Sequence, residues 1–244
     1  MLSLFKNRKC VGSAFITKAV KSSALIALTV IAFNSTATSE SELEANLQKA
    51  KAQLKLQLNH LETYSANFSQ SISDINGKEL QNSSGQLTLK TPNMLRWETL
   101  QPDETLLIAD GSTVWNVDPF VEQVTIMEQT TITQNNPLML LVSDDEQQWN
   151  AVDVKSVDIK TDGDETNRSR FVVKSKEENA NIVQLTIEFN GNVLSSLQST
   201  DRQQQKSLLV FSNIKQNEIV NPSLFSFEIS DNYIIDDQRS QSQD

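Results

Sequence analysis

Few residues of this 244-residue chain belong to the types that enzymes use as nucleophiles, bases or metal ligands. It has one histidine, His60, and one cysteine, Cys10. A serine or cysteine nucleophile needs a neighbouring base, and a usual zinc site needs several histidine or cysteine ligands. His60 lies in a helical pattern with no catalytic motif around it, and we interpret it as a solvated helix residue. These counts argue against hydrolytic and zinc-dependent enzymes.

The acidic run Asp144, Asp145 and Glu146 offers a second kind of chemistry. Clustered carboxylates bind calcium or hydrolyse glycosidic bonds in other proteins, but this run lacks the interleaved glycine of a calcium loop. We interpret it as a solvated acidic turn. The sequence also has no G-x-S-x-G, H-E-x-x-H or G-x-x-x-x-G-K-[ST] motif. We therefore predict a binding protein with no catalytic residue, no metal and no cofactor.

The first 37 residues have the composition of a secretory signal peptide. An apolar run at 24–33 is followed by the small residues Ser35 and Ala37. The run is only about half of the ~20 residues that cross a bilayer, which argues against a membrane anchor. Five basic residues and no acidic one precede the run: Lys6, Arg8, Lys9, Lys18 and Lys21. We predict that residues 1–37 are cleaved, that residues 38–244 form a single domain, and that this domain lies in the periplasm.

Cleavage would also change the charge and cysteine content. It removes Cys10 and leaves 16 basic against 31 acidic residues, a formal charge of −15. Such an acidic surface is a poor partner for nucleic acid, so we predict that the protein binds no nucleic acid. We also expect a monomer. Without a cysteine, the mature protein must be stabilised by its core and its sheet hydrogen bonds.

Two segments are predicted to be helices. Leucines recur at steps of three and four through residues 39–61, including Leu54, Leu58 and Leu61, so this helix has an apolar stripe that must be covered. Asn136 and Pro137 then open a short helix at 138–142. Its side chains are apolar on nearly every side, so it must be enclosed or must face an apolar partner.

The rest of the chain is predicted to form short antiparallel strands. Alternating apolar residues and Asn76-Gly77 predict a hairpin from residue 64 to 89, and the stretch 92–125 predicts three or four strands. Further strands are expected at 121–127, 149–159, 170–173, 182–189, 193–198 and 208–214, and a short turn or helix at Asn221-Pro222. We expect no further helix of note in the second half of the chain. The predicted fold is mainly β with helices (α+β): a strongly curved antiparallel sheet, or unclosed β-barrel, of about ten or eleven strands under a helical lid.

The stretch 92–125 carries several spaced motifs. It reads Pro92, an apolar-x-Trp strand at Leu95 and Trp97, the tripeptide Pro102-Asp103-Glu104, an Asp110-Gly111 turn, Trp115, an Asp118-Pro119 turn and Glu122-Gln123. This series resembles the LolA family, the periplasmic carriers that take lipoproteins to the outer membrane. The resemblance runs through most of the predicted mature chain and returns at residues 236–239.

The resemblance implies a fold and a binding site. Members of the family fold as an incomplete antiparallel β-barrel closed by helices, with the acyl chains of a lipoprotein in the apolar interior. By this resemblance the wall of an acyl-chain cavity would comprise Phe68, Leu87, Leu95, Trp97, Leu107 and Trp115. The lid would comprise Leu54, Leu58, Leu61, Leu138, Met139, Leu140 and Leu141. For each residue alone, ordinary core packing is an equal alternative.

One position departs from the family pattern. Where the family commonly has an arginine before the proline of the central stretch, which would hold the lid shut through backbone carbonyls, this chain has Thr91. A threonine offers one short donor and no charge. Either the hydrogen bonds that hold the lid shut, which we call the latch, are weaker in this chain, or the side chain of Lys90 or Arg96 replaces the arginine. We predict an easily opened lid.

The resemblance also implies partners: acylated lipoproteins as cargo, an inner-membrane ABC transporter as donor and an outer-membrane lipoprotein receptor as acceptor. Three other functions are alternatives. A receptor lipoprotein would need a cysteine at its mature N-terminus, and a periplasmic lipid- or lipoprotein-sensing protein that regulates a membrane partner would need a second domain. A secreted hydrolase would need a nucleophile and base pair.

Overall fold

The computed structural model describes residues 37–129, 141–142, 145–158 and 167–239. The helices are α1 (Ala37–Asn59), α3 (Glu146–Asn150) and the 3-10 helix η2 (Pro222–Phe225). The strands are β1 (Thr63–Ser73), β2 (Glu79–Lys90), β3 (Met94–Gln101), β4 (Thr105–Asp110), β5 (Thr113–Asp118), β6 (Gln123–Glu128), β7 (Val152–Asp158), β8 (Arg168–Ser175), β9 (Ile182–Asn190), β10 (Val193–Asp201), β11 (Lys206–Gln216) and β12 (Ile234–Asp237). No helix among the described residues is both long and apolar enough to cross a membrane.

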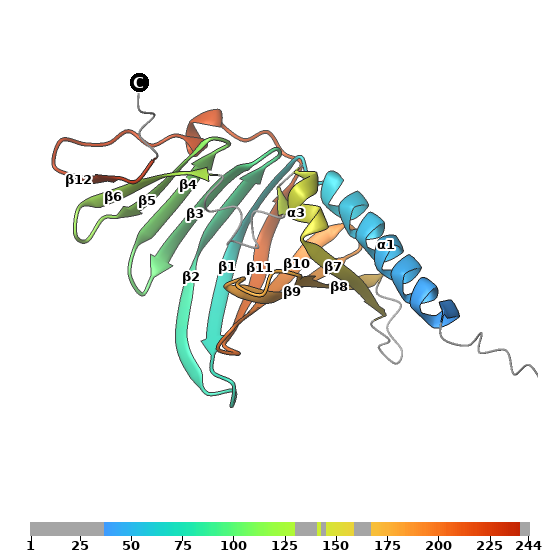
Figure 1. The fold of residues 1–244 in the computed structure, drawn as a ribbon. Coiled ribbons are helices and arrows are strands. Elements are labelled where there is room, and N and C mark those ends of the chain that lie inside the picture. Colours follow the sequence, from blue (N-terminus) through green and yellow to red (C-terminus); the bar gives the residue numbers. More distant parts are fainter. Residues whose placement is uncertain (1–36, 130–140, 143–144, 159–166, 240–244) are drawn as a thin grey trace, which may run out of the picture.

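The twelve strands that the structure describes form one curved sheet in the order β12-β6-β5-β4-β3-β2-β1-β11-β10-β9-β8-β7 (Figure 1). Neighbouring strands are antiparallel except β12, which pairs parallel to β6. Strands β12 and β7 are the two ends of the sheet, so it is not closed into a barrel. The predicted unclosed antiparallel fold is confirmed, with one or two more strands than expected.

The face of the sheet that is covered by α1 is defined by alternation along each strand, and we call it the inner face. On β1, Tyr64, Ala66 and Phe68 are buried, and they lie in register with Leu89, Leu87 and Gly85 of β2. Each step of two residues returns a side chain to the same face. The inner face continues through Leu95 of β3, and across the sheet through Leu197, Ile187 and Val173.

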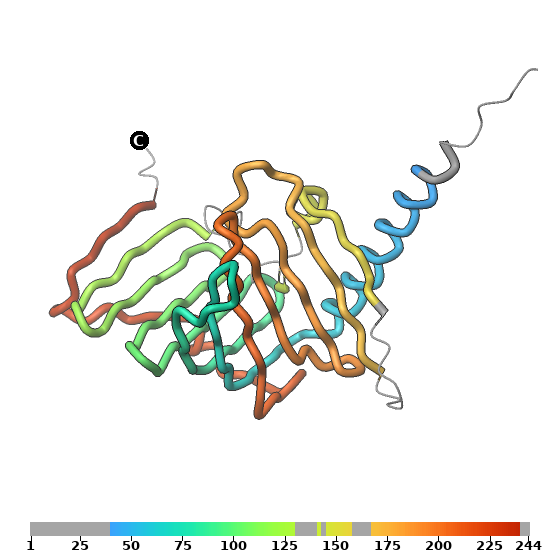
Figure 2. The backbone as a smooth tube through the Cα atoms, turned by 90° about the horizontal axis from the view of Figure 1, so that it is seen from below, coloured from blue at the N-terminus to red at the C-terminus, as the bar shows by residue number. Residues whose placement is uncertain are grey.

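A second, smaller cluster lies on the outer face of the other half of the sheet. Val117, Val124 and Ile126 are buried there beneath Phe227, Ile229 and Tyr233 of the C-terminal segment. That segment crosses the outer face and then adds β12 beside β6, as seen from below in Figure 2. Arg96 lies on this face too, because its Nη2 pairs with Glu98 at 3.1 Å and its Nη1 donates to Leu224 O at 3.5 Å.

Two elements differ from the sequence prediction. Trp149, expected to start a strand, is a buried residue of α3, and β7 begins only at Val152. Asp145 caps α3 by accepting a hydrogen bond from Gln147 N, so a residue interpreted as part of a solvated acidic turn is a helix cap. Strand β12 was not expected at all. In contrast, Asn221 caps η2 with Pro222 at its start, as the Asn-Pro pair predicts.

Helix α1 lies against β7 and α3 at one end of the sheet (Figure 1). It begins two residues before the predicted helix, and Leu61 follows its end. Its Ala50, Leu54 and Leu58, together with Leu61, are buried in the main core cluster. The predicted stripe at steps of three and four is therefore the face that α1 buries. The expected helix at 138–142 lies mostly outside the described residues. Only its Leu141 and Val142 are described.

Candidate functional site

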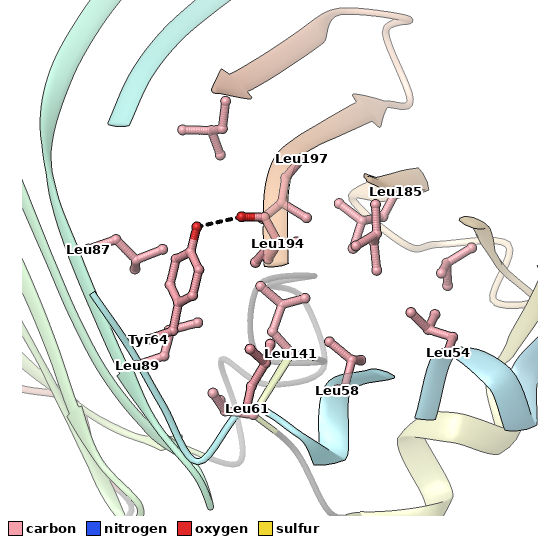
Figure 3. Close-up of a cluster of buried hydrophobic side chains, with 14 of the residues drawn as sticks. Leu54, Leu58, Leu61, Tyr64, Leu87, Leu89, Leu141, Leu185, Leu194 and Leu197 are labelled. Carbon is pink, nitrogen blue, oxygen red and sulfur yellow. Dashed lines mark hydrogen bonds between the residues drawn. The ribbon is translucent and has the colours of Figure 1, made fainter. Parts of the chain in front are cut away.

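The inner face of the sheet and the lid residues form one apolar cluster. In Figure 3, Tyr64, Leu87 and Leu89 point toward Leu194 and Leu197 from the opposite part of the sheet, with Leu54, Leu58, Leu61 and Leu141 across one end. Leu54, Tyr64 and Leu194 are each 0% exposed. In this conformation the apolar surface at this end is therefore closed to solvent.

Five of the six residues predicted for a cavity wall lie on the inner face. Phe68 of β1 and Leu87 of β2 lie on adjacent strands. Leu87 is in register with Trp97 of β3, and Trp97 is in register with Leu107 of β4. Leu95 is buried two residues before Trp97. The rings of Phe68 and Trp97 pack with centroids 4.3 Å apart. The structure thus brings these residues together, although whether they contact an acyl chain stays a proposal.

The sequence prediction that Trp115 lines the same wall is wrong. Trp115 lies in register with Ile108, whereas its neighbour Val114 lies in register with the inward-facing Ala109. Trp115 therefore points to the outer face, where it packs against the second cluster of Val117, Val124 and Ile126. The physical reason is that β5 is apolar on both faces, because each face is covered in this part of the sheet.

Four of the seven predicted lid residues can be located: Leu54, Leu58, Leu61 and Leu141 are all buried in the main cluster. Leu138, Met139 and Leu140 lie outside the described residues. The located lid residues meet Tyr64 and Leu89 of the sheet, as Figure 3 shows. A cover of this kind hides apolar surface that would otherwise promote aggregation.

Burial decreases along the inner face away from α1. On β3 and β4, Leu95 and Ala109 are fully buried, whereas Trp97 and Leu107 are half-buried and Thr105 is exposed. On β1, burial likewise falls from Tyr64 to the half-buried Ile72. We call the two ends of the inner face the closed end, near Tyr64, and the open end, near Ile72.

The turn between β2 and β3 ties both parts of the cover to the sheet. Thr91 Oγ1 donates toward Leu61 O at 3.2 Å and Glu62 O at 3.3 Å, and Thr91 N donates to Glu62 O. Asn93 N donates to Val142 O at 3.0 Å. The predicted latch position therefore does bond backbone carbonyls at the end of α1. Arg96 lies on the outer face and cannot replace it.

Asn217 is a second clamp on the same segment, and sequence reasoning missed it. Its Oδ1 accepts from Glu62 N at 2.9 Å and its Nδ2 donates to His60 O at 2.8 Å. Its backbone is left-handed (φ 59°), a conformation in which asparagine is favoured over most residues. The Gln-Asn pair at the end of the long strand β11 is the only sequence signal that marks it. Asn217 and Thr91 together fix the connection from α1 to β1.

Lysines of α1 hold α3. Lys51 Nζ donates to Trp149 O at 2.7 Å, and Lys55 Nζ pairs with Glu146 Oε1 at 2.6 Å while lying 5.2 Å from the centre of the Trp149 ring. Burial, with the nearby Lys176 charge, lowers the pKa of Lys51 from its usual value. These contacts make α1 and α3 one packed unit beside β7.

Tyr64 provides a test of packing at the closed end. Its hydroxyl donates to Leu194 O at 2.8 Å, and burial raises the pKa of Tyr64 far above its usual value. We expect Tyr64→Phe to lower the free energy of unfolding by about 1–2 kcal/mol, because the bond is lost and a buried carbonyl loses a partner. Chemical denaturation measures this.

The same substitution should change how stability depends on pH. A tyrosine whose pKa is raised by folding contributes stability that is present below the unfolded pKa, near 10, and is lost as the pH rises above it. The wild type should therefore lose stability above about pH 10 more steeply than Tyr64→Phe. Equal slopes would contradict the burial of this hydroxyl.

The curved sheet, its single continuous apolar inner face and the helix that covers it define an unclosed β-barrel protein. The model of the family described as outer membrane lipoprotein carrier protein LolA matches residues 59–228. This chain belongs to that family.

Three relatives illustrate the similarity, and each is named outer-membrane lipoprotein carrier protein. The one from Actinobacillus succinogenes is 36% identical over 196 residues, covering 80% of this chain and 89% of the relative. The one from Haemophilus influenzae is 35% identical over 196 residues, with 80% and 90% covered. The one from Shewanella frigidimarina is 35% identical over 208 residues, with 83% and 92% covered. These matches confirm the resemblance found in the motifs of residues 92–125.

Proposed function

We propose that this protein is a periplasmic lipoprotein carrier that holds the acyl chains of its cargo against the inner face of the sheet. The observation that carries this proposal is the apolar inner face of the sheet, which α1 and Leu141 cover. Membership of the carrier family and the names of the relatives support it. The role needs no catalytic step.

Acyl chains make such a carrier necessary. Each methylene contributes about 0.8 kcal/mol to membrane binding, so one chain of ordinary length is retained by on the order of 10 kcal/mol. A lipoprotein with two or three chains therefore does not cross water unprotected. The proposed donor is an inner-membrane ABC transporter, and the proposed acceptor is an outer-membrane lipoprotein receptor that binds the cargo more tightly.

Native mass spectrometry of the protein purified from the periplasm of a Gram-negative host tests the proposal. We expect a fraction of the molecules to retain an acylated polypeptide, released only by detergent or organic solvent. Protein that carries no acylated polypeptide, even when a lipoprotein is co-expressed, would refute the carrier function. Retention of free lipid alone would instead favour a lipid-sensing domain.

Loading requires the cover to open, and the hydrogen bonds of Thr91 oppose opening. We expect Thr91→Val to bind an apolar fluorescent dye more readily, because it removes the hydrogen bond to Leu61 O and Glu62 O that opposes opening. That bond is worth about 1 kcal/mol. Thr91→Arg should reduce dye binding, because a charged fork makes stronger bonds to carbonyls. Dye titrations at equal protein concentration measure both.

Thr88→Val is the matched control for this pair, because Thr88 lies near the end of β2, three residues before Thr91, in register with the outward-facing Ser65. It should leave dye binding unchanged. An unchanged dye response for both Thr91 variants would show that the turn between β2 and β3 does not restrain the cover.

A further inference from the structure

A cluster of uncharged polar side chains lies at the open end of the inner face. Ser83 Oγ donates to Gln70 Oε1 at 2.7 Å, and Gln70 Nε2 donates to Ser207 Oγ at 2.7 Å. The three residues come from β2, β1 and β11, which are adjacent strands. Gln70 follows Phe68 on the inward side of β1, so the cluster borders the apolar surface.

The cluster has hydrogen-bonding capacity beyond these two bonds. A glutamine amide nitrogen has two hydrogens, and one of them is directed at Ser207. The Ser207 hydroxyl accepts that bond and retains its own hydrogen for donation. Gln70 and Ser207 are half-buried rather than sealed, so a ligand that lies on the inner face can reach them. What they offer is a pair of neutral donors next to an apolar surface.

Among the described strands, the inner face of the sheet offers no positive charge. In the twelve strands that the structure describes, every lysine and arginine lies at an outward position, as register shows for Lys90, Arg96 and Arg170. Arg170 pairs on that outer side with Glu188. A phosphate group placed at the open end would therefore leave water without a cationic partner on the sheet, which is costly. An ester or amide carbonyl needs only a neutral donor.

We propose that Gln70, Ser83 and Ser207 form a headgroup subsite that recognises the uncharged ester and amide linkages of an acylated cysteine and discriminates against phospholipids. Gln70 Nε2 and Ser207 Oγ donate to the linkage carbonyls, and Ser83 orients the Gln70 amide. The acyl chains then extend from the open end along Trp97 and Leu87 toward the closed end. This inference rests on the proposed carrier function.

The test compares two synthetic probes of equal chain length: a tripalmitoylated S-glyceryl-cysteinyl peptide and dipalmitoyl phosphatidylglycerol. We expect the wild type to prefer the lipopeptide. Gln70→Leu removes the amide at similar volume, and it should weaken lipopeptide binding about 5- to 10-fold. It should leave the phospholipid unaffected, because the phosphate without a cationic partner keeps the esters of that lipid away from Gln70. Ser207→Ala is a smaller change for the case that Gln70→Leu does not fold, and it should weaken lipopeptide binding about 3- to 5-fold.

Gln86→Leu is the matched control, because Gln86 is exposed on β2 in register with Asn67, on the outer side. It should not change either affinity. A second probe, a lipopeptide whose glyceryl esters are replaced by ethers, isolates the carbonyls. The wild type should bind the ether form about 5- to 10-fold more weakly than the ester form, and this difference should be smaller in Gln70→Leu.

The outcomes separate this subsite from the carrier function. If Gln70→Leu leaves the wild-type ratio of lipopeptide to phospholipid affinity unchanged, or if the wild type binds the ether form as tightly as the ester form, the headgroup subsite is overturned and the carrier function stands. If the wild type binds neither acylated probe, the carrier function itself fails. A purely structural role for Gln70 would lower both affinities together, which also overturns the subsite.

Discussion

Gly85→Ala is expected to lower the free energy of unfolding by about 3 kcal/mol or more, at the upper end of the range for overpacking a core. A methyl group at this position would lie 1.9 Å from Glu98 O and 2.8 Å from Phe68 Cζ. Glu98 O belongs to the backbone of β3, so no side-chain rotation relieves the contact. The two strands would have to separate where β2 pairs with β3.

The close approach has a structural origin. Pairing of β2 with β3 shifts between Ser84 and Gly85, where Gly85 faces Thr99 and Ser84 faces Gln101. Such a bulge disrupts the regular ladder and bends the strand, and glycine often lies at a bulge or where another backbone approaches closely. Gly85 also leaves room for Phe68, whose ring packs against Trp97. The substitution should therefore disturb the half-buried part of the inner face as well as the sheet.

Gly191→Ala is the control for Gly85→Ala. Gly191 has φ +62° in the β9–β10 turn, and an added methyl group meets nothing within 4 Å. It should cost only about 1 kcal/mol, from the left-handed backbone. Urea denaturation of both variants gives the comparison. A Gly85→Ala protein as stable as Gly191→Ala would mean that β2 and β3 are not this close.

The alternation of apolar and polar residues, together with the turn residues, was sufficient to predict most of the sheet, because one face of the sheet is buried and the other is largely exposed to solvent. Strand β9 shows this best, since Leu185, Ile187 and Phe189 are all buried on the inner face. Asn76-Gly77 likewise predicted the hairpin of β1 and β2. These signals are local, and local signals fix local structure.

What the sequence did not predict depends on contacts between distant segments. Strand β12 has four residues with no alternation, and it is defined by its pairing with β6, about a hundred residues earlier along the chain. The C-terminal segment covers the outer face of β5, which makes both faces of that strand apolar. Alternation then could not decide between Val114 and Trp115 as the inward residue. The clamp by Asn217 depends on the same kind of long-range approach.

Glutamate substitutions of the two tryptophans in the stretch 92–125, Trp97 and Trp115, are expected to affect binding of an acylated peptide differently. Trp97→Glu should weaken binding of an acylated peptide by about 100-fold or more, because it places a carboxylate beside the acyl chains, where it loses water without gaining a partner. Trp97 is half-buried toward the open end of the inner face, so the carboxylate stays hydrated in the empty protein and the fold should persist. Titration with the tripalmitoylated peptide measures the loss.

Trp115→Glu is the matched comparison: the same substitution, two strands away, on the outer face. The substitution should reduce stability through lost packing on the cluster of Val117, Val124 and Ile126. The variant should still bind the acylated peptide within about threefold of the wild-type affinity, because a carboxylate on the outer face lies outside the proposed site. Both variants are compared at a temperature where circular dichroism shows them folded. Equal loss of binding would mean that acyl chains do not lie on the inner face. A Trp97→Glu protein that binds normally would exclude this end of the face, because no carboxylate that close to hydrocarbon is without cost.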